Sequence, residues 1–262
     1  MRRLILLVAL VALVAAAVTT PAAAQGPCGS ACLESLAGAF VDGLAAGRAG
    51  AGIAWGPRVA ATENGVPTMV GDGIWASITA HGMARLVVAD PALHGVVWIG
   101  EIDEHGQPGW LALRLREAGG RIVEAEALLR RKEGHPPFAD PAAASIPVNR
   151  VPPKARLSRA RLVALATGAR REPDARNGDP HAPQPGGALR AMTLAAVDPA
   201  RGLVVDVGRR DHWGAPDDAD GTFPHSYAVV RLTTVIASRV ERVEEFDSDL
   251  LPYLMPDWRH RR

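Results

Sequence analysis

The chain contains one pattern twice, and this internal repeat limits its architecture more than any other feature. The sequence DPALHGVV at 90–97 returns as DPARGLVV at 198–205, with one residue fewer before the glycine. Each copy continues with a strand-like segment, LALRL or AVVRL, and then with a charged one, RIVEAE or RVERVE. Such a duplication predicts two similar units in one chain.

The repeat also predicts which residues occupy equivalent positions. It equates Arg114 with Arg231 and Glu126 with Glu244. Strand alternation places four side chains of the first unit on one face: Ile122, Glu124, Glu126 and Leu128. The recurring carboxylate either lines a pocket in each unit or forms a cross-strand ion pair with the recurring arginine. We favour the ion pair, because such pairs are common in sheets.

The first 24 residues are expected to be a secretory signal peptide. Arg2 and Arg3 precede an apolar run over 4–18, and small residues follow, up to a cleavage site between Ala24 and Gln25. The apolar run is shorter than the ~20 residues that span a membrane, so cleavage is favoured over the alternative, an uncleaved membrane anchor. No second apolar run of spanning length occurs in the sequence, so no membrane association is expected after cleavage. We therefore expect a secreted or periplasmic protein.

A linker rich in Pro and Ala is expected over 133–154, where no apolar periodicity occurs. It separates a first domain over 28–132 from a second, diverged domain over 155–258. The 29 basic and 28 acidic residues give a formal net charge of +1, so the charge predicts no nucleic-acid partner.

Cys28 and Cys32 are the only cysteines, and they lie at the start of an expected helix. An oxidising compartment favours a structural disulfide between them. A redox role would favour Cys-x-x-Cys, and a zinc site needs more ligands.

Each unit begins with a helical pattern and continues with strands, which predicts the α+β class. The apolar positions of the helices are Leu33, Leu36, Phe40 and Leu44 in the first unit, and Leu157, Leu162, Leu165 and Ala166 in the second. Ser30 and Ser158 are the expected N-caps, and Asn64-Gly65 predicts a tight turn. Strands are expected over 95–102, 109–116, 121–129, 203–209, 227–234 and 239–246.

Six short motifs, in order along the chain, resemble a secreted SnoaL-like family with the nuclear transport factor 2-like fold. They are TENG at 62–65, GDGIW at 71–75, ADP at 89–91, LRL at 113–115 with RIVEAE at 121–126, DH at 211–212, and PYLMPDW at 252–258. The resemblance implies two cones, each a curved antiparallel sheet packed on N-terminal helices, with a pocket between sheet and helices. Relatives with this fold include cofactor-free isomerases, dehydratases, cyclases and lyases, and also members that only bind a ligand or dimerise. The resemblance therefore implies either an enzyme of one of these classes or a non-catalytic protein.

In the first unit, Glu63, Asp72 and His81 are candidate catalysts, and Trp75 and Arg85 are candidate ligand-binding residues. The resemblance places this segment near the pocket mouth. Desolvation beside an apolar cavity moves the pKa of a carboxyl or imidazole group towards neutral pH, which suits acid–base catalysis. The structural alternative is that the two carboxylates stabilise turns and that the histidine lies on the surface.

In the second unit, Asp211 and His212 are candidate catalysts and Tyr227 is a candidate ligand-binding residue. Adjacent strand residues face opposite sides, so Asp211 and His212 share one pocket only if a bulge intervenes. The irregular spacing of His181, His212 and His225 does not indicate a metal site. No phosphate-binding, serine hydrolase, EF-hand or dinucleotide motif occurs in the sequence, so no cofactor is expected.

Two functions from different classes follow from these features. One is a cofactor-independent isomerase, dehydratase or lyase that uses acid–base chemistry on a small apolar organic molecule. The other is a non-catalytic module that binds a small ligand or mediates assembly. An enzyme requires at least two ionisable groups that converge on one pocket, whereas a binder requires an apolar lining and a polar anchor. The sequence leaves open whether the protein is catalytic and whether it forms a homodimer.

Overall fold

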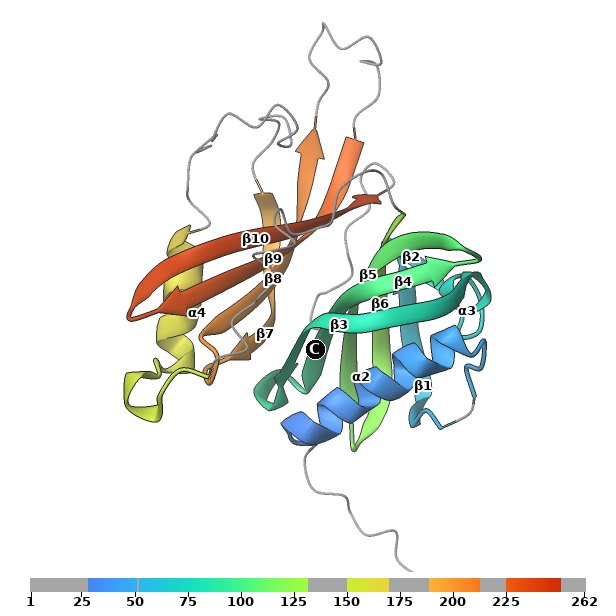
Figure 1. Ribbon diagram of the computed structural model, residues 1–262, viewed down its shortest axis with the longest axis horizontal. Coiled ribbons are helices and arrows are strands. Elements are labelled where there is room, and N and C mark those ends of the chain that lie inside the picture. Colours follow the sequence, from blue (N-terminus) through green and yellow to red (C-terminus); the bar gives the residue numbers. More distant parts are fainter. Residues whose placement is uncertain (1–27, 51, 132–149, 170–188, 213–224, 251–262) are drawn as a thin grey trace, which may run out of the picture.

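The computed structural model describes residues 28–50, 52–131, 150–169, 189–212 and 225–250. It is an α+β protein built mostly of strands, as predicted. A six-stranded mixed sheet carries the N-terminal helix, and a separate sheet has four antiparallel strands (Figure 1). We call the described residues up to 131 the first unit and those from 150 the second unit.

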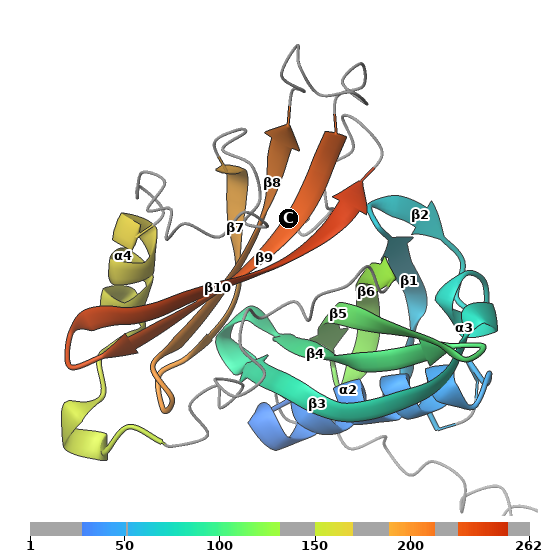
Figure 2. The same cartoon turned by 45° about the horizontal axis from the view of Figure 1, so that its top comes forward.

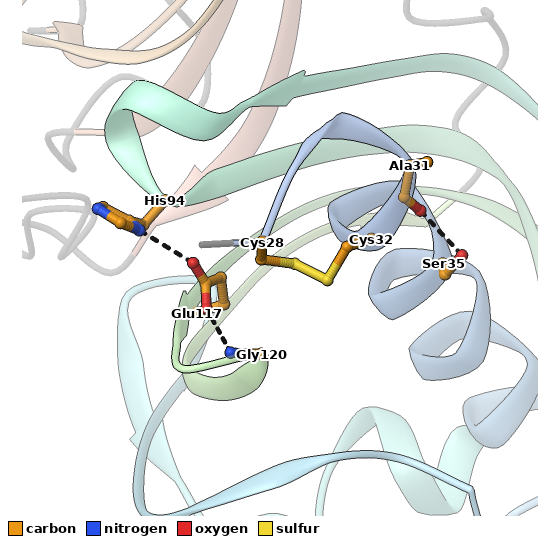
Figure 3. The surroundings of a disulfide bond; sticks show 7 residues. All are labelled: Cys28, Ala31, Cys32, Ser35, His94, Glu117 and Gly120. Atoms are coloured by element: carbon orange, nitrogen blue, oxygen red, sulfur yellow. Dashed lines mark hydrogen bonds and ion pairs between the residues drawn. A yellow bond between two sulfur atoms is a disulfide. The ribbon is translucent and has the colours of Figure 1, made fainter. Parts of the chain in front are cut away.

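Helix α2 (Ser30–Ala45) packs across one face of the first sheet, against β3 and β4. Its predicted apolar residues, Leu33, Leu36, Phe40 and Leu44, are buried. The predicted N-cap Ser30 is wrong, because Gly29 holds that position without a side-chain hydrogen bond. The first turn is instead spanned by a disulfide between Cys28 and Cys32, whose Cα atoms lie 5.4 Å apart (Figure 3).

The first sheet has the strand order β2-β1-β6-β5-β4-β3. Its strands are β1 (Trp55–Glu63), β2 (Val66–Thr68), β3 (Ile78–Asp90), β4 (Gly95–Glu104), β5 (Gln107–Ala118) and β6 (Arg121–Arg131). β1 runs parallel to β6, and every other neighbouring pair is antiparallel. Asn64 and Gly65, both with positive φ, form the predicted turn between β1 and β2. A short helix, α3 (Ile74–Ser77), precedes β3.

The second unit consists of α4 (Arg159–Ala169) and the strands β7 (Leu189–Asp198), β8 (Leu203–His212), β9 (His225–Ile236) and β10 (Arg239–Leu250), which follow one another across the sheet. The predicted N-cap is present, because Ser158 Oγ accepts a hydrogen bond from Arg161 N at 3.3 Å. Leu162 and Ala166 of α4 pack on the sheet. Part of the expected linker belongs to this unit, since Val151 N donates to Ala200 O at 2.7 Å.

The two sheets pack face to face, and α4 lies on the far side of the second sheet (Figure 2). We call the shared apolar cluster the inter-sheet core. The first sheet contributes Leu86, Val88, Val97, Ile99, Ala112 and Leu128, and the second contributes residues that include Leu203, Val205, Val230, Leu232 and Phe246. The layers therefore follow the order α2, first sheet, second sheet, α4.

Strands β3 to β6 correspond to β7 to β10, but one predicted equivalence is wrong. Arg114 lies opposite Glu126, whereas Leu232 lies opposite Glu244 at the same place in the second hairpin. Arg114 is thus equivalent to Leu232 and not to Arg231. The error arises because the segment from Arg231 to Glu244 is one residue longer than that from Arg114 to Glu126, which changes the face on which the arginine lies.

The predicted position of Ile122 is also wrong. The register between β5 and β6 shifts between Arg116 and Glu117, and such a bulge reverses the alternation of side chains beyond it. Ile122 is therefore buried in the core beneath α2, whereas Leu128 lies in the inter-sheet core.

A group of charges lies beside the inter-sheet core on the first sheet. Arg114 is only 2% exposed, and it donates to Glu126 Oε2 at 2.8 Å and to Glu124 Oε2 at 3.3 Å. Arg116 donates to Glu124 Oε1 at 3.0 Å. The predicted ion pair between Arg114 and Glu126 is confirmed, and it is almost completely removed from water.

Glu244 occupies the position equivalent to Glu126 but lies opposite a leucine. Burial raises the pKa of Glu244, and the Arg242 guanidinium, 3.1 Å away, opposes this effect. The second copy therefore keeps the buried carboxyl group without the buried arginine.

Replacing Glu244 with glutamine is expected to stabilise the protein at neutral pH. Because its pKa is higher in the folded than in the unfolded state, ionisation costs stability as the pH rises from 4.5 through the folded-state pKa. Urea unfolding of the Glu244→Gln variant between about pH 4 and pH 8 should show a gain over the parent that grows with pH and then levels off. A gain that does not change with pH would contradict this account.

Candidate functional site

Glu63 is the predicted catalyst whose structural role is clearest. Its Oε2 atom accepts a hydrogen bond from Ile74 N at 2.9 Å, at the start of α3. A side chain at Gly73 would collide with the same oxygen, and Gly73 has a positive φ of 58°. Glu63 therefore joins the end of β1 to α3, in agreement with the structural alternative for this residue.

Asp72 and His81 lie in different surroundings. Asp72 is exposed. His81 Nε2 lies 3.0 Å from Asp42 Oδ1 on α2, and the ring also meets the edge of Trp98 at a centroid distance of 6.4 Å. Within the described residues, no hydrogen bond or ion pair joins Glu63, Asp72 and His81 to one another.

Trp75, the predicted aromatic wall, is part of the first core. Its ring centroid lies 5.0 Å from that of Phe40 and 6.0 Å from that of Trp55, and all three side chains belong to or pack against the core beneath α2. The space between helix and sheet at this point is filled by aromatic rings. Arg85 lies in β3, but its side chain is outside the described part of the molecule.

The predicted catalysts of the second unit lie at the ends of two paired strands. The register places His212 opposite His225 and Asp211 opposite Ser226. The side chains of Asp211, His212 and His225 are outside the described part of the structure, as is the whole of His181. Tyr227 is half-buried and lies opposite Arg210.

The sequence did not predict a group of charges on the second sheet, which we call the Arg–Glu–Arg cluster: Arg210, Arg231 and Glu245. Both Nε and Nη2 of Arg231 donate to Glu245 Oε1, at 2.9 and 2.7 Å. Arg210 Nη2 donates to Glu245 Oε2 at 2.7 Å. One carboxylate thus joins two guanidinium groups across three strands.

The Arg–Glu–Arg cluster lies on the side of the second sheet that faces α4. Arg231 is opposite Asp206 in β8, which is fully buried. In the two strands, Val204 and Val235 pack against α4 and lie at even spacing from Asp206 and Arg231, so the four side chains share one face. The cluster continues the surface on which the helix sits.

The electrostatics of the cluster keep Glu245 ionised. Burial raises its pKa, but Arg210 and Arg231 lower it by charge and by hydrogen bonding, and the net effect is a lowered pKa. Arg231 has a further donor, Nη1, which is buried and finds no acceptor among the described residues. Because an unsatisfied buried donor is costly, this nitrogen is suited to an oxygen atom supplied by a ligand.

Within the ranges that the structure describes, no three His, Cys, Asp or Glu side chains group together as ligands for a metal ion. In the same part of the chain, no helix is both long and apolar enough to cross a lipid bilayer. The chain matches no protein-family model, no curated protein and no solved structure.

Proposed function

We propose that the second unit binds a small organic molecule through one of its oxygen atoms, with Arg231 as the polar anchor. The observation that carries the proposal is the buried Nη1 atom of Arg231, which has no acceptor among the described residues although the other two nitrogens of its guanidinium both donate to Glu245. Guanidinium groups form their strongest hydrogen bonds with carboxylates, so a carboxylate or carbonyl oxygen fits this anchor best.

The proposal assigns a supporting role to the first unit. Its interior beneath α2 contains Phe40, Trp55 and Trp75 in mutual contact, and its candidate catalysts engage in structural contacts or are exposed. Ionisable groups that meet at one place, as an enzyme requires, occur in the second unit, in the Arg–Glu–Arg cluster.

Binding is favoured over acid–base catalysis at this cluster. A general base must exchange its proton near the working pH, whereas two arginines lower the pKa of Glu245. A carboxylate held in this way orients its two guanidinium partners and is a poor proton acceptor. The cofactor-free isomerase, dehydratase or lyase implied by the resemblance would therefore need another group, and Tyr227 opposite Arg210 is the nearest candidate by register.

We further propose that both units are nuclear transport factor 2-like cones. The helix across the first sheet, the meander from β3 to β6 and the parallel pairing of β1 with β6 support this assignment for the first unit. The described part of the second unit has one α-helix and the four-stranded meander. It lacks a described counterpart of the β1–β2 hairpin.

A titration with three probes that differ only in their polar group tests the binding proposal. Benzoate and acetophenone should shift amide NMR signals of β8, β9 and β10, and benzyl alcohol should bind more weakly by roughly tenfold, because it lacks the carbonyl oxygen. Arg231→Lys keeps the charge but loses the planar fork, so it should weaken benzoate binding by about tenfold or more.

Arg242→Lys is the matched control, since Arg242 is on the neighbouring strand and pairs with Glu244 instead. Benzoate affinity should stay within about twofold of the parent in this variant. Equal losses in both variants, or signal shifts confined to the first unit, would contradict the proposal.

A further inference from the structure

The two units meet through corresponding strands. β3 lies against its counterpart β7, and β6 lies against its counterpart β10, while β4 also lies against β7. The apolar side chains between the sheets come from both units, as described above for the inter-sheet core. Contacts between equivalent strands, such as these two, are expected when two like subunits pair about a two-fold axis.

The repeated Asp-Pro-Ala segment supplies polar contacts across this interface. Asp90 Oδ2 accepts a hydrogen bond from Val197 N in the other unit at 2.8 Å. In the opposite direction, Arg201, which follows the second copy of the motif, donates to Val87 O. The first copy of the motif thus contacts β7, and the residue after the second copy contacts β3. In each case, the strand contacted is the one that leads into the motif of the other unit.

A second pair of polar contacts joins β10 to the first unit. Ser248 Oγ lies 2.8 Å from Leu129 O and 3.2 Å from Asn64 Oδ1. Ser248 is 2% exposed, so these contacts are shielded from water. Polar contacts at the edges and a continuous apolar centre are the anatomy of a specific protein–protein interface.

We infer that the chain is a dimer within one polypeptide. The face of the first sheet opposite α2 is a docking surface for the second unit. The association of the two units does not depend on the segment 132–149 that connects them. The same surface accepts the second unit of another copy of this chain, so the units can exchange between molecules. This inference is independent of the proposed ligand site, which lies on the opposite side of the second sheet.

Cutting the connection in the folded protein tests the inference. A site for a specific protease is placed within 132–149 of the full chain, and the chain is cut after folding. The two fragments should elute together at the size of the uncut protein. When cut protein with and without nitrogen-15 labelling is mixed, native mass spectrometry should detect pairs with one labelled fragment, up to about half of the total.

Two variants show whether the described contacts hold the fragments together. Arg201→Ala, which removes the contact with Val87, should weaken their association by about tenfold or more. Arg156→Ala is the control, because Arg156 donates to Val151 O within its own unit, and it should change the association by less than about twofold.

Each remaining outcome would overturn the inference. Fragments that separate after cutting would show that the connection holds the units together. Fragments that stay together but never exchange would show an interlocked fold in place of two docked surfaces. Equal weakening by both arginine variants would show that the contact of Arg201 with the first unit is not specific.

Discussion

Replacing Arg114 with leucine should lower the free energy of unfolding by about 3–5 kcal/mol at neutral pH. The guanidinium is 2% exposed and donates to Glu126 at 2.8 Å, so its removal leaves a buried carboxylate without its main counter-charge. Urea unfolding followed by circular dichroism would measure the loss. The second unit has the arrangement that this variant would create in the first, because Leu232 stands at the position equivalent to Arg114 and lies opposite Glu244. Burial raises the pKa of Glu244 there.

The loss in Arg114→Leu should depend on Glu126, the carboxylate that the substitution leaves without this arginine. The double variant Arg114→Leu/Glu126→Gln should recover much of the loss at neutral pH, since it contains neither charge. If the double variant is as unstable as the single one, the lost packing of the arginine side chain, and not the uncompensated carboxylate, causes the effect.

Replacing Asp90 with alanine should cost about 3–5 kcal/mol, measured in the same way. Asp90 is 1% exposed and accepts hydrogen bonds from three elements: Ala92 N in its own turn, Val197 N in β7 and Arg159 Nη1 at the start of α4. The substitution deprives the buried amide of Val197 of this acceptor and removes a polar contact between the two units.

Asp103→Ala is the matched control for Asp90. Its carboxylate also caps a turn, where it accepts from Gly106 N and Thr79 Oγ1, but these contacts stay within the first unit and are solvent-accessible. We expect a loss of about 1 kcal/mol. If the two alanine variants are equally stable, the contact of Asp90 with the second unit contributes nothing to folding.

The elements that the sequence predicted are those determined by local pattern. The helical spacing of Leu33, Leu36, Phe40 and Leu44 predicted α2, and the Asn64-Gly65 turn has the expected positive φ. The six predicted strands are present and longer by up to four residues at an end. Strands β1, β2, β3 and β7 were not predicted. The pairing of β1 with β6 joins residues far apart in the sequence, and nothing in the local pattern reveals it.

The candidate site depended on register, which the sequence did not determine. A shift between Val240 and Arg242 in β10 and the extra residue in that hairpin place Arg231 opposite Glu245 and not opposite Glu244. Arg210 joins the same carboxylate from β8, one strand further away. A single added residue changes which side chains share a face of the sheet, so the sequence does not show that these three residues meet. The only signal for the Arg–Glu–Arg cluster in the sequence is that these strands carry charged residues.

The presence of both halves in one chain also affects how the interface can change over generations. In a pair of identical subunits, every mutation occurs on both sides of the contact at once. Here a mutation reaches one side only, so a replacement that two copies could not accommodate together can persist in one. A buried arginine at 114 and a leucine at 232 are such a difference. Because both halves are inherited in one gene, each half can change its sequence independently of the other.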